Sequence, residues 1–91
     1  MKQLVSSVYT KKDSMGNTFG LAVLKHKKHK KYIYYVAYCP PFTVPPVWLA
    51  LSEQEHTDIT GAEEEVSHIV SVDNWAIADE TTKKILSEGL K

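Results

Sequence analysis

The sequence contains no arginine and only one cysteine, and each scarcity excludes a class of chemistry. Arginine supplies the planar fork that reads guanine edges and grips phosphates through two hydrogen bonds, so any anion binding here must use lysine as a point charge. With Cys39 alone, no internal disulfide can form, which favours a reducing compartment and predicts a cytoplasmic location. We expect Cys39 to pack as a small apolar group, because no lysine flanks it to favour a reactive thiolate.

Long apolar runs and glycine-rich motifs are absent as well. No run approaches the roughly 20 apolar residues of a membrane span, and the first ten residues lack the order of a signal peptide. The four glycines are well separated, which excludes a phosphate-binding loop, and Ser67, His68 and Asp73 occur without the context of a catalytic triad. We therefore expect a protein without catalytic residues, cofactor or membrane contact.

The chain has 91 residues, of which 43% are apolar and 24% charged, a composition typical of a globular protein. A chain of this size buries about two-thirds of the surface that its unfolded form exposes, which suffices for a core without staples. We expect a single compact domain over residues 1–91.

The formal net charge is zero, but the charges are divided along the chain. Residues 1–38 hold eight lysines and one acid, whereas residues 39–91 hold ten acids and three lysines. The division predicts a bipolar surface if the fold keeps the two halves apart. It also raises the hypothesis that copies of the protein associate through their opposite charges.

The most unusual stretch is residues 25–38, KHKKHKKYIYYVAY. Residues 18–25 are largely apolar on both faces of an extended chain, which predicts an inner strand. Residues 32–38 predict a second strand that pairs with it. The lysines between them cannot be buried, so we expect a solvated hairpin tip with tyrosines beside it for stacking. The residues of this predicted binding surface are Lys25, Lys27, Lys28, Lys30, Lys31, Tyr32, Tyr34 and Tyr35. His26 and His29 have a metal-like spacing, but their lysine neighbours would repel a divalent cation, and no metal site is expected.

Residues 2–12 alternate as a first strand, and residues 13–17 form a turn cluster. Residues 39–46, CPPFTVPP, predict a stiff extended crossover whose Phe42 and Val44 pack against the core. Residues 47–51 follow as a short strand with Trp48 as its anchor. The acidic residues between 53 and 65 are expected to form a solvated face, and docking of a basic partner on them is the alternative.

Residues 62–72 fit two patterns. Thr60 and Glu63 have the spacing of a helix capping box, and apolar residues recur at helical intervals, but β-branched residues alternate from Val66 to Val72 and favour a strand. The last segment is less ambiguous. Asp79 is predicted to cap a helix over residues 80–88, with Gly89 as its left-handed terminal residue.

These elements predict an α+β fold, an antiparallel β-meander or small open barrel of about five strands with a C-terminal helix. The expected function is a macromolecular contact made by a non-enzymatic binding protein. One hypothesis is an interaction module or inhibitor that docks on another protein through Tyr32, Tyr34, Tyr35, Phe42 and Trp48. The alternative is DNA or RNA binding through the lysine-rich hairpin, residues 25–31. Tyrosines exposed beside the lysines would favour nucleic acid, whereas an exposed patch away from them would favour a protein partner.

Overall fold

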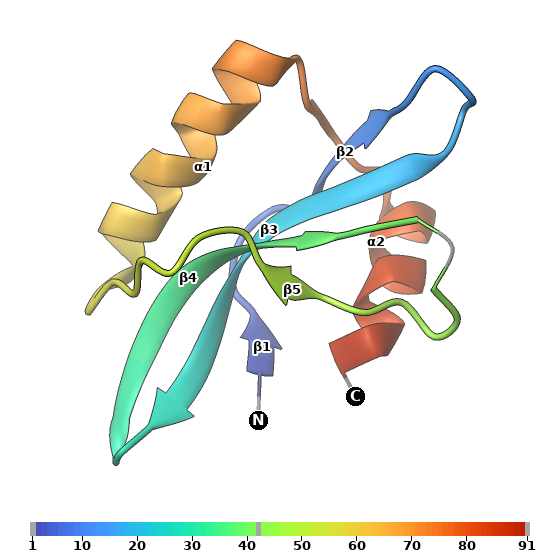
Figure 1. Ribbon diagram of the computed structural model, residues 1–91. Helices are drawn as coiled ribbons and strands as arrows, with labels where there is room; N and C mark the ends of the chain where they lie inside the picture. The colour runs from blue at the N-terminus through green and yellow to red at the C-terminus, as the bar shows by residue number, and fades with distance from the viewer. Residues whose placement is uncertain (1, 42, 91) are drawn as a thin grey trace.

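One antiparallel sheet organises the protein, as seen in a computed structural model that describes residues 2–41 and 43–90. Its strands follow the order β5-β4-β3-β2-β6, and β1 pairs separately with β3 (Figure 1). The sheet does not close into a barrel, and two helices complete an α+β fold, as predicted. The strands are β1 (Lys2–Leu4), β2 (Tyr9–Lys12), β3 (Thr18–Lys28), β4 (Lys31–Cys39), β5 (Leu49–Ala50) and β6 (Ala76–Ile77).

The first predicted strand, residues 2–12, is divided into two short strands that pair with the same edge of β3. Leu4 lies opposite Leu24 and Tyr9 opposite Leu21, so two extra residues are accommodated between β1 and β2 as a bulge. There the Ser6 hydroxyl accepts a hydrogen bond of 2.9 Å from the Val23 amide, in place of a backbone carbonyl. The prediction of one continuous strand is therefore wrong. The interruption is tolerated because the Ser6 side chain accepts the hydrogen bond of the Val23 amide.

The β3–β4 hairpin forms the centre of the sheet, and its side chains divide between two apolar clusters. Leu21, Val23 and Val36 face one side, where Ala62 and Val66 of α1 (Ile59–Asp73) cover them. We call this the α1-side cluster. On the other face lies the α2-side cluster, in which Ala22, Leu24, Tyr35, Ala37 and Cys39 pack with Trp48 and Leu86. Residues 21–24 are fully buried, which confirms that β3 is an inner strand covered on both faces.

Residues 59–73 form the helix α1, so the preference for a strand over residues 62–72 is wrong. Asp58, and not Thr60, is the N-cap, and its carboxylate accepts a 3.2 Å hydrogen bond from the Gly61 amide. The helix ends at Asn74, which adopts the left-handed conformation with φ of 58°. The chain then returns to the sheet as β6.

The C-terminal helix α2 (Glu80–Ser87) begins after Asp79, whose carboxylate accepts a 2.7 Å hydrogen bond from the Thr82 amide, as predicted. Leu86 of α2 packs on the sheet, and its carbonyl accepts a 2.8 Å hydrogen bond from the Trp48 indole. Gly89 does not serve as a left-handed cap. It lies in a short 3-10 turn, Glu88–Leu90, at a place where a Cβ would collide with the carbonyl of Pro46.

The proline-rich crossover differs from the prediction at Val44, which is 97% exposed and does not pack against the core. Phe42, the other residue expected there, lies outside the described residues. Trp48 is buried as the predicted anchor of the following segment, although the strand itself is only β5. Among the described residues, no helix is long and apolar enough to cross a membrane.

Candidate functional site

The lysine-rich stretch lies at the free end of the β3–β4 hairpin, which extends beyond the rest of the sheet (Figure 1). On one edge, β1 pairs with β3 only between Leu24 and His26. On the other edge, the pairing nearest the tip joins Tyr34 to His56. Residues 27–32 therefore form a two-stranded ribbon with no third strand beside it in the described structure. We call residues 25–32 the basic tip.

The ribbon ends in a two-residue turn, because Lys28 pairs directly with Lys31. His29 and Lys30 both have positive φ, 51° and 68°. Positive φ at both central residues is the mark of the tight hairpin turn whose twist matches that of its strands. The predicted hairpin tip is therefore a compact turn, and the strands themselves carry most of the lysines.

The lysines of the basic tip lie on both faces of the ribbon. Lys25 and Lys27 share the α1 side of the sheet with Tyr32 and Tyr34, since side chains alternate along each strand. The Lys25 ammonium lies 4.1 Å from the centre of the Tyr32 ring, and that of Lys27 lies 5.9 Å from it. These are cation–π contacts, which hold the ring among positive charges.

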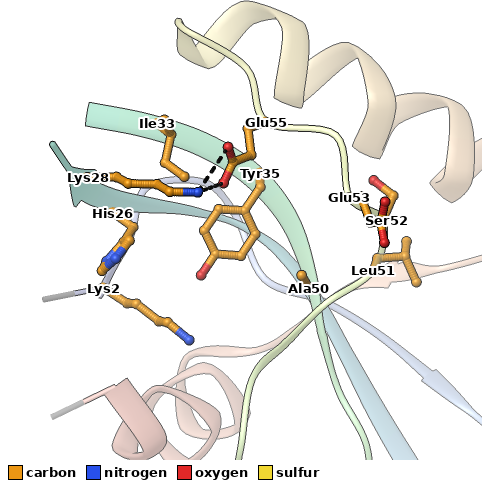
Figure 2. Close-up of a pocket in the computed structure, with 10 residues that line it drawn as sticks. All are labelled: Lys2, His26, Lys28, Ile33, Tyr35, Ala50, Leu51, Ser52, Glu53 and Glu55. Carbon is orange, nitrogen blue, oxygen red and sulfur yellow. Dashed lines mark hydrogen bonds and ion pairs between the residues drawn. The ribbon is translucent and has the colours of Figure 1, made fainter. Parts of the chain in front are cut away.

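One lysine of the basic tip is paired with an acid of the same chain. The Lys28 ammonium lies 3.2 Å from a carboxylate oxygen of Glu55 (Figure 2). Both side chains are about half exposed, so this pair contributes little stability and is easily exchanged. The structure, as described for residues 2–41 and 43–90, gives no ion pair to Lys25, Lys27, Lys30 or Lys31.

The aromatic residues expected at a binding surface are not brought together. Tyr32 is 50% exposed and Tyr34 is partly buried, both beside the lysines. Tyr35 and Trp48 are 8% and 4% exposed, so the expectation that they present rings to a partner is wrong. Their burial follows from alternation and packing, because Tyr35 points to the α2-side cluster and the Trp48 indole is bound to α2. Phe42 is not described.

An apolar surface that the sequence did not single out lies along the edge strand β5. Val47, Leu49 and Leu51 are each between 42% and 44% exposed. β5 pairs with β4 at Ala37 and Tyr38, at the opposite end of β4 from the tip. We call these three residues the β5 edge. Because β5 is a short strand at the edge of the sheet, no further element covers these side chains in the described structure. The apolar run VWLAL did not predict this exposure.

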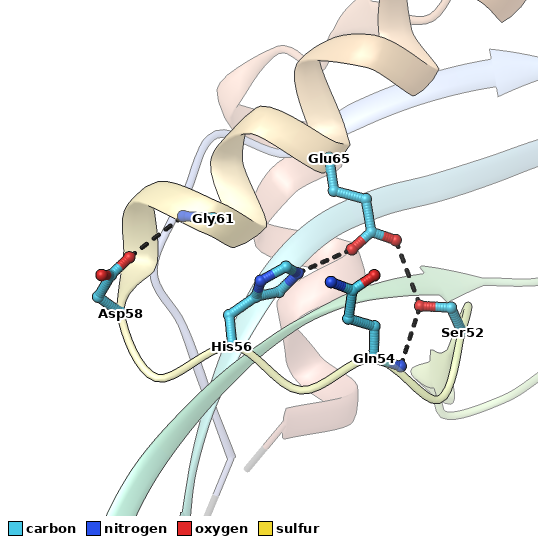
Figure 3. Close-up of polar contacts among 6 residues, drawn as sticks. All are labelled: Ser52, Gln54, His56, Asp58, Gly61 and Glu65. Carbon is cyan, nitrogen blue, oxygen red and sulfur yellow. Dashed lines mark hydrogen bonds and ion pairs between the residues drawn. The ribbon is translucent and has the colours of Figure 1, made fainter.

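The acidic segment serves partly structural roles (Figure 3). Glu65 accepts a 3.2 Å hydrogen bond from the Ser52 hydroxyl and lies 3.0 Å from the His56 ring. Asp58 caps α1, as described above, and Glu55 pairs with Lys28. These contacts fasten residues 52–58 to α1 and to the hairpin. The exposed carboxylates of Glu53, Glu63 and Glu64 are left to form the solvated face.

Cys39 is 1% exposed, and burial raises the pKa of its thiol. A thiol with a raised pKa in a closed core is a poor nucleophile, in keeping with the expected packing role. In the part of the chain that the structure describes, no three metal-ligating side chains come together.

Comparisons of this chain with protein-family models, with curated proteins and with solved structures find no significant match.

Proposed function

We propose that this protein is a non-enzymatic binding protein that contacts nucleic acid through its basic tip. The observation that carries the proposal is the free two-stranded ribbon, on which four lysines lack an acidic partner among the described residues. Two of them, Lys25 and Lys27, lie against the half-exposed ring of Tyr32. The major groove of DNA admits a two-stranded β-ribbon of this kind. An exposed tyrosine among lysines also suits a single strand, whose bases stack on aromatic rings.

The chemistry of the basic tip predicts binding to the phosphate backbone with little preference for sequence. Lysines neutralise phosphates as point charges, and without arginine the fork that reads guanine is missing. Each neutralised phosphate releases counterions, so four lysines give a slope of about −3.6 in log K against log salt for duplex DNA. Affinity should then fall about a hundredfold between 50 and 200 mM salt.

The test compares two triple variants that lose the same charge. Lys27→Gln/Lys30→Gln/Lys31→Gln removes charge from the basic tip, and Lys11→Gln/Lys12→Gln/Lys84→Gln removes it from exposed positions elsewhere. Fluorescence anisotropy with a labelled duplex and a labelled single strand measures binding at several salt concentrations. We expect the tip variant to lose at least tenfold in affinity and the matched variant to stay within about threefold of wild type. Equal losses in both variants, or no binding by wild type at 50 mM salt, would contradict the proposal.

Stability must be measured on the same variants. All six lysines are exposed, so we expect each triple variant to unfold within about 0.5 kcal/mol of wild type. A tip variant that binds poorly while folding normally then reports on the contact and not on the fold.

A protein partner is the second candidate, and the β5 edge is the observation that favours it. Exposed apolar side chains next to an open sheet edge are typical of surfaces that accept another chain. With a protein partner on the β5 edge, this protein acts as an interaction module or inhibitor. Capture of the partner from the native cell should then resist nuclease, and it should be lost in Leu49→Lys but kept in the tip variant. Nuclease-sensitive capture that depends on the tip lysines would instead favour nucleic acid.

We also propose a cytoplasmic location, on the ground that the single cysteine is buried and unpaired. Self-association is a further proposal, with the basic tip of one copy meeting Glu63 and Glu64 of another. Sedimentation at low salt should show a mass that rises with protein concentration and returns to that of the monomer at 0.5 M salt. A monomer at every concentration would exclude it.

A further inference from the structure

A hollow of about 650 Å³ opens on the α2 side of the sheet, on the opposite face from Lys25 and Tyr32. Its walls come from the hairpin, from Lys2 of β1 and from residues 50–55 (Figure 2). Ile33, Ala50 and Leu51 give it an apolar side. The hollow shares two lining residues, His26 and Lys28, with the basic tip, and the Lys28 ammonium is held by Glu55 at the rim.

Tyr35 places a polar group in this hollow that the protein itself does not use. The residue is only 8% exposed, and its hydroxyl has no hydrogen-bond partner among the described residues. In Figure 2 the hydroxyl points toward the side of the hollow where Lys2 and His26 lie. Burial and the nearby Glu55 carboxylate raise the pKa of Tyr35, so the hydroxyl keeps its proton and is available as a donor.

Two more polar groups stand at the same end of the hollow. Lys2 lies opposite His26 in the pairing of β1 with β3, and both side chains line the hollow. The Lys2 ammonium has no ion-pair partner among residues 2–41 and 43–90. The Nδ1 atom of His26 is buried without a hydrogen-bond partner. An unpaired cation and an unpartnered phenol hydroxyl therefore lie at the same end of the hollow as His26, beside an apolar wall.

We propose that this hollow binds a small organic carboxylate, with its anionic group between Lys2 and the Tyr35 hydroxyl and its apolar body against Ile33, Ala50 and Leu51. A carboxylate accepts hydrogen bonds from both donors and neutralises the single unpaired cation. Glu53 and Glu55 also line the hollow and disfavour a second negative charge on the ligand, which selects a monoanion over a phosphate or a dicarboxylate. A few polar groups beside an apolar wall are the usual composition of a small-molecule site.

The experiment titrates ¹⁵N-labelled protein with 3-phenylpropionate and follows the amide resonances by NMR. A ligand of this size in such a site is expected to bind with a Kd of about 1 mM. We expect saturable shifts at Ile33, Ala50 and Leu51. The matched probes are 3-phenylpropylamine, which keeps the ring and reverses the charge, and sodium acetate, which keeps the carboxylate without the ring.

Two variants and their matched controls locate the contact. Tyr35→Phe removes only the hydroxyl, and Lys2→Gln removes only the charge; each should weaken binding about tenfold. Tyr38→Phe and Lys12→Gln make the same changes away from the hollow and should bind as wild type does. Because the Tyr35 hydroxyl has no hydrogen-bond partner in the protein, Tyr35→Phe should fold as wild type does. Lys2 is exposed, so Lys2→Gln tests the site even if Tyr35→Phe is unstable.

Four results would overturn the proposal. The first is the absence of a saturable shift with 3-phenylpropionate, and the second is binding of 3-phenylpropylamine as tight as that of 3-phenylpropionate. The third is that acetate causes the same shifts as 3-phenylpropionate, which would indicate an adventitious anion only. The fourth is undiminished binding of 3-phenylpropionate by both Tyr35→Phe and Lys2→Gln. Because none of these readouts involves nucleic acid, the result is independent of the function proposed for the basic tip.

Discussion

At the scale of single residues, the contact between Gly61 and His56 shows why a glycine occupies the first turn of α1. A Cβ at residue 61 would lie 2.6 Å from Nδ1 of the His56 ring. That ring packs against α1 and lies 3.0 Å from Glu65, so the bare backbone of Gly61 makes the room that this contact requires (Figure 3).

Gly61→Ala should therefore destabilise the protein by about 1–2 kcal/mol, because the ring must shift away from Glu65. In a His56→Ala background the obstruction is gone, and the same substitution should stabilise by about 0.5–1 kcal/mol, since alanine loses less entropy than glycine in a helix. Urea unfolding of the four proteins in this cycle measures both effects. The same sign of change in the two backgrounds would contradict the steric explanation.

Asp79 makes a second residue-scale prediction, which concerns acid. Hydrogen bonds from Thr82 hold the pKa of Asp79 below its ordinary value of 3.8. The stabilisation is therefore present above pH 3.8 and is lost as pH falls through the lower pKa of the folded state. Asp79→Asn keeps a capping oxygen but does not titrate in this range, so its stability should decline less steeply below pH 3.8 than that of wild type. Parallel acid unfolding curves for the two proteins would show that the titration of Asp79 does not contribute to the loss of stability in acid.

At the scale of secondary-structure elements, the β3–β4 hairpin is central, and its turn carries conformational strain. His29 and Lys30 adopt left-handed backbone conformations that cost non-glycine residues about 1 kcal/mol or more each. His29→Asn/Lys30→Gly installs the pair preferred in this turn.

The double variant should raise the free energy of unfolding by about 1 kcal/mol without altering the sheet. Denaturant unfolding measures the gain, and His29→Asn alone should give an intermediate value. A decrease in stability would mean that the side chains at the turn make contacts worth more than the strain. Since Lys30 is lost, nucleic-acid affinity should fall by the effect of one charge only.

The helix α1 illustrates how tertiary contacts override a local pattern. Val66, Val70 and Val72 alternate as in a strand, but Val66 is 3% exposed and Val72 is 64% exposed. As a helix, the segment presents Ala62, Val66, Ile69 and Val70 to the apolar face formed by Leu21, Val23 and Val36. That face must be covered, and helical spacing covers it with residues from three successive turns. Local β-propensity is worth less than this burial.

At the scale of the whole molecule, the second half of the chain wraps the first. Residues 2–38 form β1 to β3 and most of β4, while α1 and α2 cover opposite faces of that sheet. The positively and negatively charged halves are thus layered and do not form two separate poles. The strongest local concentration of one charge is the basic tip, because it extends beyond both helices (Figure 1).

Gly89 allows the turn after α2 to pack closely against the proline-rich crossover. A Cβ at this residue would overlap the carbonyl of Pro46, a backbone group that cannot turn away as a side chain can. Gly89→Ala should cost about 2–3 kcal/mol by displacing either the terminal turn or the segment before Trp48.

Thermal or urea unfolding measures this cost. Gly16→Asn is the matched control, because Gly16 has φ of 82° and nothing near its missing Cβ, and asparagine tolerates that conformation. The control should lie within about 0.5 kcal/mol of wild type. A Gly89→Ala variant as stable as the control would show that the crossover adjusts freely.

The elements whose patterns are local could be predicted from the order of the amino acids alone. Alternation identified β3 and β4, charge identified the tip between them, and capping chemistry identified the start of α2 at Asp79. These features follow from one strand or one turn and need no knowledge of what packs against them.

Features that depend on neighbours distant along the chain could not be predicted in this way. The side on which Tyr35 lies, the burial of Trp48, the helical state of residues 59–73 and the close approach of Gly89 to Pro46 were all set by packing. The hollow beside Tyr35 is likewise lined by residues from segments far apart in the sequence, namely β1, the β3–β4 hairpin and residues 50–55. Burial is a property of pairs of segments, so its consequences appear only when those segments meet in space.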